Sequence, residues 1–219
     1  SSAASDVYKR QYVEEGCEIV CFSISNSMST SGNVMRLAAG ELEAENRITV
    51  IDSANLSTGI GLLVIEAAIM AKNGHSASEI ASVMETLKPN VRASFVVDTL
   101  TYLYRGGRCN AVAAMAGGVL KLHPKIVVEN GAMDATKKYR GKINSVIMSY
   151  VKDMETDLKA ARPDRVFITH SGCDAATVES VRSYLESLGV FHEILETRAG
   201  GVVSSHCGPG TLGVLFIAK

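Results

Sequence analysis

The sequence predicts an α/β fold in two domains, a parallel α/β sheet domain followed by an α+β domain. In the first part of the chain, apolar runs of strand length alternate with longer helical patterns, as in a parallel sheet with helices on its faces. The second part contains Asn130-Gly131 between two β-rich runs, a strong hairpin signal that does not belong to a purely parallel sheet. With 47% hydrophobic residues, the 219-residue chain is long enough to bury a sizeable core.

The charge balance argues against a nucleic-acid partner. Twenty-two Lys and Arg stand against 23 Asp and Glu, for a net charge of −1, whereas surfaces that follow phosphates need an excess of cations. Aromatic residues make up only 5% of the chain and Trp is absent, so a base-stacking platform is not expected.

Cysteine usage predicts a cytoplasmic protein. The five cysteines are scattered and form no CxxC motif, which disfavours a disulfide framework and a zinc site. No signal peptide and no apolar run of membrane-spanning length is visible. We therefore expect no metal and no cofactor. The cysteines are Cys17, Cys21, Cys109, Cys173 and Cys207.

The chain divides into three predicted segments. Residues 1–11 lack helical and strand periodicity and resemble a non-native scar, which we exclude from the fold. Residues 12–90 form the N-terminal α/β domain, which we expect to be incomplete because the chain enters it at the tail of a helix that stops at Gly16. Residues 91–219 form the C-terminal α+β domain, with the boundary near Pro89.

Each element of the first domain has its own signal. Apolar or β-branched runs predict strands, helical spacing of apolar residues predicts helices, and Ser76 to Glu79 is a capping box that opens the last helix. The expected elements are a strand over 18–24, a helix over 34–42, a strand over 48–51 and helices over 56–73 and from Ser76 to Leu87.

The second domain mixes strands, a hairpin and helices. Strand runs flank Asn130-Gly131, and a long stretch with apolar residues at helical spacing follows the hairpin. The expected strands are 93–97, 124–129, 132–136, 165–169, 190–195 and 212–218, and the expected helices are 98–104, 111–120, 140–161 and 175–188.

A serine-rich loop is the first candidate site. Seven small polar residues follow the first strand, and in an open α/β sheet ligands bind at the carboxyl ends of strands. The next helix begins there, and its N-terminus favours a carboxylate or phosphate. Ordinary N-capping by Asn26 or Ser29 is the alternative interpretation. The seven are Ser23, Ser25, Asn26, Ser27, Ser29, Thr30 and Ser31.

The second candidate is His206, in a Gly-Pro-Gly turn before the last strand. Beside Ser204 and Ser205, this imidazole is a plausible donor to an anion. A purely structural histidine is the plainer alternative. A nucleophilic pair of Cys207 with His206 is a weaker one, because neighbours in an extended segment point to opposite sides.

Gly106-Gly107-Arg108 and the small-residue helix after it form a third candidate region. The helix either packs closely on a neighbour or leaves room for a slender ligand, and Arg108 could face an anion or an acidic partner surface. The sequence contains no paired carboxylates, P-loop, HExxH or GxSxG motif.

Taken together, these segments resemble the DegV family of fatty-acid-binding proteins. Each motif alone is weak, but their order and spacing hold over about 200 residues. The segments that carry the resemblance are Ile24–Ser29, Val50–Gly61, Asp98–Arg108 and Ser205–Gly210.

The resemblance implies a two-domain carrier, not an enzyme, that buries a long-chain fatty acid and presents it to a separate ATP-dependent fatty acid kinase. The acyl phosphate made by the kinase would serve phospholipid synthesis. The resemblance assigns the carboxylate to Ser25, Asn26 or Ser29 together with His206, and we allow for transient contact with a membrane surface. Residues near the ligand or the kinase would be Gly107, Arg108, Ser205, Gly208 and Gly210.

The rival hypothesis is a substrate-binding subunit like that of dihydroxyacetone kinases, whose fold is related. Under it, His206 would hold a small polar ligand in a short, wet pocket. The apolar stretch from Leu56 to Met70 and the Ala- and Gly-rich helix favour a long apolar tunnel instead.

Overall fold

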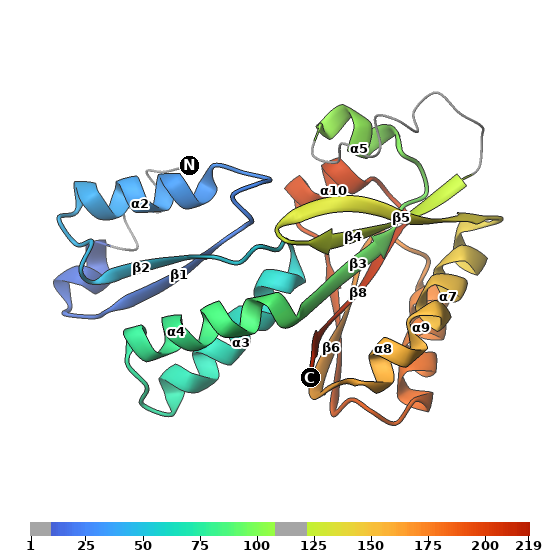
Figure 1. The fold of residues 1–219 in the computed structure, drawn as a ribbon. Coiled ribbons are helices and arrows are strands. Elements are labelled where there is room, and N and C mark those ends of the chain that lie inside the picture. Colours follow the sequence, from blue (N-terminus) through green and yellow to red (C-terminus); the bar gives the residue numbers. More distant parts are fainter. Residues whose placement is uncertain (1–9, 108–121) are drawn as a thin grey trace.

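The computed structural model describes residues 10–107 and 122–219, which form two sheets surrounded by helices (Figure 1). Residues 10–14 are helical, and the helix predicted over 111–120 lies outside the described residues. The strands are β1 Ile19–Ser23, β2 Ile48–Asp52, β3 Val91–Val96, β4 Leu122–Glu129, β5 Ala132–Arg140, β6 Ala161–Ser171, β7 Glu193–Arg198 and β8 Thr211–Ala218. The helices are α2 Ser31–Glu41, α3 Thr58–Lys72, α4 Ala77–Leu87, the short 3-10 helix Lys88–Asn90, α5 Thr101–Gly106, α7 Ile143–Asp153, α8 Glu155–Lys159, α9 Ala175–Ser187 and α10 Gly201–Cys207.

The smaller sheet consists of β1 and β2 in parallel, as predicted for the N-terminal part. Side chains alternate between its faces. Ile19 and Ile48 pack with Ala39 of α2 on one face, whereas Phe22 and Ile51 pack with α3 and α4 on the other. Coverage of both faces is what a parallel sheet requires.

The larger sheet has six strands in the order β5-β4-β3-β8-β6-β7, with only β6 and β7 parallel. Val214 and Phe216 face the helices α7, α8 and α9, which cover one side. Phe167, Leu215 and Ile217 face the opposite side, where α3 packs, and α5 and α10 cover the same side nearer to β4. The mixed α/β architecture predicted from the sequence is therefore confirmed.

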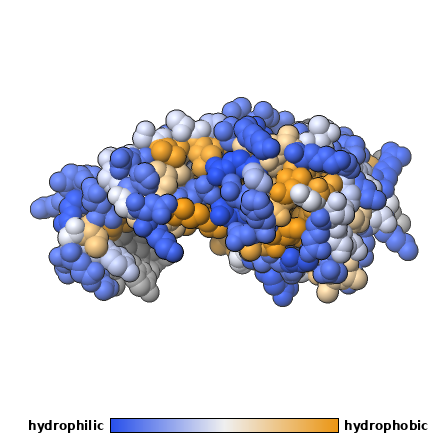
Figure 2. All heavy atoms as spheres, turned by 90° about the horizontal axis from the view of Figure 1, so that it is seen from below, coloured by the Kyte–Doolittle hydropathy of each residue, from blue (hydrophilic) through white to orange (hydrophobic). Residues whose placement is uncertain are grey.

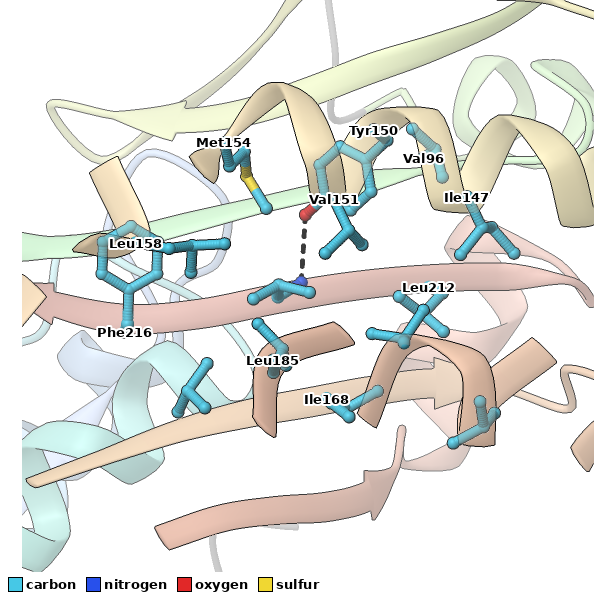
Figure 3. Close-up of a cluster of buried hydrophobic side chains, with 14 of the residues drawn as sticks. Val96, Ile147, Tyr150, Val151, Met154, Leu158, Ile168, Leu185, Leu212 and Phe216 are labelled. Atoms are coloured by element: carbon cyan, nitrogen blue, oxygen red, sulfur yellow. Dashed lines mark hydrogen bonds between the residues drawn. The ribbon is translucent and has the colours of Figure 1, made fainter. Parts of the chain in front are cut away.

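The core under α7 is built around one buried tyrosine (Figure 3). The Tyr150 hydroxyl donates to the carbonyl of Ser94 at 2.7 Å and accepts the Val214 N–H at 3.0 Å (Figure 3). Ser94 and Val214 lie opposite each other on β3 and β8. Tyr150 thus satisfies backbone groups in the middle of the sheet while its ring fills the core.

Helix α3 joins the two sheets. Its Glu66 carboxylate pairs with Arg162, at 3.0 Å, and with Arg165, both on β6. At its N-terminus, the Thr58 and Thr169 hydroxyls lie 2.5 Å apart. One continuous cluster of apolar side chains runs from the smaller sheet across α3 to the larger one. The division of the chain at residues 90 and 91 stays a prediction.

Two short motifs fold as predicted. In the capping box, the Ser76 hydroxyl accepts the Glu79 N–H at 3.3 Å, and the Glu79 carboxylate accepts the Ser76 N–H at 2.8 Å. In the hairpin, Asn130 and Gly131 have φ values of 50° and 79°, as a tight primed turn requires. Strands β4 and β5 continue beyond the predicted ranges, from Leu122 to Arg140.

The helix predicted over 140–161 is wrong at both ends and in the middle. Arg140 pairs with Leu122 in the hairpin, and Ala161 already belongs to β6. Met154, with φ −93° and ψ 5°, separates α7 from α8. The apolar spacing continues across this break, so periodicity alone could not reveal it.

Other boundaries also differ from the prediction: β6 begins four residues earlier than expected, at Ala161, and α5 three residues later, at Thr101. Helix α2 begins three residues earlier, at Ser31, and β7 begins three residues later, at Glu193. Helix α3 begins at Thr58 because Ser57 has a φ of 51°, outside the helical region. Such errors are typical where capping residues and β-branched residues compete for an element end.

Apolar surface gathers near the middle of the molecule when it is seen from below (Figure 2). Exposed large apolar side chains include Val64 and Ile69 of α3 and Val83 of α4. None of the helices in the described ranges is long and apolar enough to cross a bilayer.

Candidate functional site: a serine-rich loop, a histidine helix and an apolar cavity

The loops that follow β1 and β2 meet at one edge of the smaller sheet, because parallel strands share their carboxyl ends. The Asp52 carboxylate accepts the Asn26 N–H at 3.3 Å and the Ala54 N–H at 2.9 Å. The Ser25 N–H donates to the Asn55 carbonyl at 2.9 Å. These bonds hold the serine-rich loop, residues 23–31, in a fixed shape beside the loop after β2.

Ser25 lies buried inside this loop. Its hydroxyl donates to the Gly131 carbonyl at 2.6 Å and accepts the Ser27 N–H at 3.2 Å. Gly131 is the tip of the β4–β5 hairpin, which projects toward the smaller sheet (Figure 1). Ser25, the first of the predicted carboxylate ligands, therefore also forms a contact between the two sheets.

Asn26 and Ser29 lie on the same loop but in more open positions. Asn26 is exposed, and its side chain lies so close to Gly32 that a Cβ there would come within 2.7 Å of its Oδ1. The half-buried Ser29 hydroxyl accepts the Ser31 N–H at 3.2 Å and shares a hydrogen with the Ser31 hydroxyl at 2.8 Å. Both side chains therefore face the beginning of α2, the end that favours anions.

His206 lies in the last turn of helix α10, not in an extended turn. Residues Gly201–Cys207 form this helix, and the turn begins only at Gly208, with a φ of 81°. The imidazole is half-buried against Gly106 of α5, where any Cβ would overlap it. Gly106 therefore sets the close approach of α5 to α10.

Gly208 and Gly210, in the turn after α10, make close contacts with neighbouring residues. Gly208 packs against the Tyr102 ring so closely that a side chain there would collide with it. The Gly210 N–H donates to the Ser171 carbonyl at 3.0 Å. Gly107 ends α5 in the left-handed region, with a φ of 62°. Ser205 is exposed, and its hydroxyl donates a hydrogen bond to the Val202 carbonyl, one turn earlier in α10, at 2.8 Å.

The predicted site residues thus fall into two groups. Ser25, Asn26 and Ser29 share one loop, and His206 lies with its neighbours on α5 and α10. Within the described ranges, no hydrogen bond or ion pair joins the two groups, and the β4–β5 hairpin runs from one toward the other (Figure 1). Arg108 and Cys109 lie outside the described residues.

Between the groups, a small apolar cavity lies under α10. It has a volume of about 30 Å³, and the loop just before α3, the strands β3, β6 and β8, and α10 line it. Most of the lining is apolar, and the polar residues Ser57, Thr169, His170, Ser171 and Thr211 also contribute to it. Side chains at its walls include Leu56, Phe95, Val203, Cys207 and Leu215, and the small residues Ala93 and Gly213 leave the space beside Phe95.

The sequence analysis did not identify these cavity residues. The available signal was weak: Ala93 and Gly213 are small residues within otherwise bulky strands, and only strand pairing shows that Gly213 lies opposite Phe95. A separate polar groove of about 520 Å³ lies between α7 and α9, remote from every predicted site residue.

Cys207 is not an activated nucleophile. Burial raises the pKa of its thiol to about 12, so the thiolate that would attack is almost absent at neutral pH. We expected Cys207 and His206 to lie in an extended segment, and this expectation was wrong because both lie in α10. The burial of Cys207, instead of an extended backbone, is what disfavours a nucleophilic pair with His206. In the described part of the chain, no cluster of His, Cys, Asp and Glu could hold a metal ion.

A mixed α/β chain with two sheets joined through one helix, a hydroxyl-rich loop and an apolar cavity has the features of a small-molecule-binding protein. The family model described as "Uncharacterised protein, DegV family" matches residues 1–219. The chain therefore belongs to the DegV family, and the resemblance found in the sequence is confirmed.

Individual relatives agree with this membership. A DegV domain-containing protein of Deinococcus radiodurans is 31% identical over 206 residues, which cover 93% of this chain and 71% of that protein. Among solved structures, a DegV family protein from Thermus thermophilus, described for its fatty acid binding, is 28% identical with a TM-score of 0.86; the match covers 100% of this chain and 77% of that one. A stearic acid-binding protein from Eubacterium ventriosum is also 28% identical, with a TM-score of 0.84 and coverage of 100% and 76%.

Proposed function

We propose that this protein binds a long-chain fatty acid, with the carboxylate at the serine-rich loop and His206 and the hydrocarbon chain along the apolar cavity under α10. The observation that carries the proposal is the position of this cavity. Its walls are mostly apolar, and it lies directly beneath the helix that presents His206. Two structural relatives are described as binding fatty acids.

The energetics favour such a ligand. Burial of about 14 methylenes contributes roughly 0.8 kcal/mol each, so the chain alone supplies ample affinity. The head group then needs only a few donors, and Asn26, Ser29 and His206 supply them without a buried cation. A carboxylate at the start of α2 also gains from the helix dipole.

The cavity must widen to take the whole chain. A volume of about 30 Å³ corresponds to roughly one water molecule or one methylene. Val203 and Cys207 lie on the short helix α10, whereas Ala93 and Leu215 belong to central strands. Movement of α10 away from the sheet is therefore the simplest way for an acyl chain to enter.

The proposed carrier acts with a separate ATP-dependent fatty acid kinase that forms an acyl phosphate for phospholipid synthesis. Exposed Gly107 and Ser205, with Arg108, Gly208 and Gly210, would lie near the ligand or the kinase. Cys17, Cys173 and Cys207 are free thiols, which fits the reducing cytoplasm that we propose as the location of the protein.

The test is a binding measurement that includes both ligand classes. Isothermal titration with palmitate should give saturable binding at one molecule per chain, and dihydroxyacetone should give none. Binding of dihydroxyacetone without palmitate would instead support the substrate subunit of a dihydroxyacetone-kinase-like enzyme. The apolar lining of the cavity argues against that outcome.

A further inference from the structure

The hydrogen bond between Ser25 and Gly131 joins parts of the chain that are 106 residues apart. It connects the serine-rich loop of the smaller sheet with the hairpin tip of the larger one. Gly131 has a φ of 79°, and a Cβ at this position would come within 2.7 Å of the Ser25 hydroxyl. The close approach at 2.6 Å therefore depends on glycine.

The Ser25 hydroxyl has only one proton to donate. It donates this proton to the Gly131 carbonyl, and its oxygen accepts the Ser27 N–H. A carboxylate that accepts a hydrogen bond from Ser25 must therefore replace Gly131. It competes well, because hydrogen bonds to an ionised acceptor are about twice as strong as those between neutral groups.

The hairpin extends from this contact to the helices that carry the second group of site residues. Met133 and Ala135 of β5 pack against an apolar cluster that includes Leu103 of α5 and Cys207 of α10. A shift of the hairpin therefore changes the packing beneath α5 and α10. His206 and the exposed side chains of Tyr104 and Val202 lie on these helices.

We propose that Ser25 acts as a latch that responds to ligand binding: a bound carboxylate replaces the Gly131 carbonyl as the acceptor of the Ser25 hydrogen bond, which releases the hairpin tip and alters the α5–α10 surface. This inference rests on the proposed fatty acid binding and adds a regulatory step to the same site. The hydrocarbon chain by itself does not release the latch, because only the carboxylate competes with the Gly131 carbonyl. A charged head group and an uncharged one should thus have different effects on the hairpin.

Hydrogen exchange of the 219-residue chain, read by mass spectrometry, tests the latch. With saturating palmitate, amides at residues 129–133 should exchange roughly three- to tenfold faster than without ligand, the factor expected for loss of one hydrogen bond. Hexadecanol, with the same chain and no charge, should leave them unchanged. Unchanged exchange with palmitate bound would refute the latch alone, whereas no palmitate binding would refute the carrier function as well.

Two variants of the same loop complete the experiment. Ser25→Ala should show fast exchange at residues 129–133 without ligand and no further change at saturating palmitate, and its palmitate affinity should be lower because the carboxylate loses one hydrogen bond. Ser27→Ala, an exposed neighbour, should behave like the wild type. Equal hairpin responses to palmitate in Ser25→Ala and in the wild type would overturn the proposal.

Discussion

At the scale of single residues, burial separates the two neighbours at the end of α10. Cys207 faces the apolar cavity and is buried, whereas His206 is half-buried against α5. Successive residues of a helix point about 100° apart, so Cys207 faces the core while His206 faces α5. This division agrees with the polar role proposed for His206 and with a packing role for Cys207.

Replacement of His206 should weaken fatty acid binding. In His206→Ala, loss of one hydrogen bond to a charged group predicts roughly 10- to 100-fold lower affinity for palmitate. Isothermal titration measures the change. His192→Ala, an exposed histidine remote from the cavity, is the matched control and should bind like the wild type. Equal affinities in the two variants would remove His206 from the site.

Thiol chemistry should distinguish the cysteines. Because burial raises the pKa of Cys207 to about 12 and that of Cys173 to about 11, both should resist alkylation at pH 8. The exposed Cys17 should be modified first. Peptide mapping after brief iodoacetamide treatment gives the order of modification, and early labelling of Cys207 would contradict its buried position.

Part of the site could be predicted at this scale. The loop with Ser25, Asn26 and Ser29 was identifiable, because seven small polar residues after a strand exceed the needs of one cap. The contact of Ser25 with Gly131 was not, because no local pattern relates residues 106 positions apart. The role of each serine-loop residue in binding stays a prediction.

At the scale of secondary-structure elements, side chains complete hydrogen bonding that the backbone leaves open. The Tyr150 hydroxyl bridges β3 and β8 through Ser94 and Val214. On the surface, Asp153 at the end of α7 accepts hydrogen bonds from Lys137 at 2.6 Å and Tyr139 at 2.7 Å, both on β5. Together these bonds fix α7 across the sheet.

Removal of the Tyr150 hydroxyl should therefore be costly. Tyr150→Phe leaves a buried N–H and a buried carbonyl without this partner, and we expect a loss of about 1–3 kcal/mol in the free energy of unfolding. Urea denaturation provides the value. Tyr184→Phe, which loses a bond to Glu155 nearer the surface, should cost less. A smaller loss for Tyr150→Phe than for Tyr184→Phe would contradict the bridging role.

Elements with a single strong local signal were predictable, and those defined by tertiary contacts were not. The capping box of α4 and the Asn130-Gly131 turn are determined by residues that are adjacent in the sequence, so the sequence shows them directly. Helix α10 has no such local signal, because Gly201 and the residues around His206 have weak helix propensity. Packing against α5 stabilises this helix.

At the scale of the whole molecule, buried groups that are neutral when protonated make the fold sensitive to alkali. Burial raises the pKa of the Tyr150 hydroxyl and that of the Cys207 thiol above their ordinary values. The folded chain therefore holds these protons more tightly than the unfolded chain does. Their contribution to stability is complete below the unfolded pKa values, near 8.5 for Cys and 10 for Tyr, and is lost as pH rises above them.

The free energy of unfolding should accordingly fall between about pH 9 and pH 12. Denaturation series across this range measure the slope. Tyr150→Phe is less stable at neutral pH but should lose less stability per pH unit above pH 10, because one titrating group is gone. A slope identical to that of the wild type would show that Tyr150 ionises freely in the folded protein.

The two-sheet architecture also determines where a ligand can lie. Helix α3 ties the smaller sheet to the larger one through Glu66 and Thr58, and Leu56 and Ser57, just before it, border the cavity. The α/β alternation and the hairpin allowed the fold class to be predicted from the sequence. The cavity could not be predicted, because it arises where β3, β8, α3 and α10 meet.

Native mass spectrometry with palmitate tests the central claim most directly. The wild-type chain should retain one fatty acid, and the variant carrying both Ser29→Ala and His206→Ala should lose it while remaining folded by circular dichroism. Retention by the double variant would contradict the proposed head-group site, and a folded wild-type chain that retains no palmitate would contradict the carrier function itself.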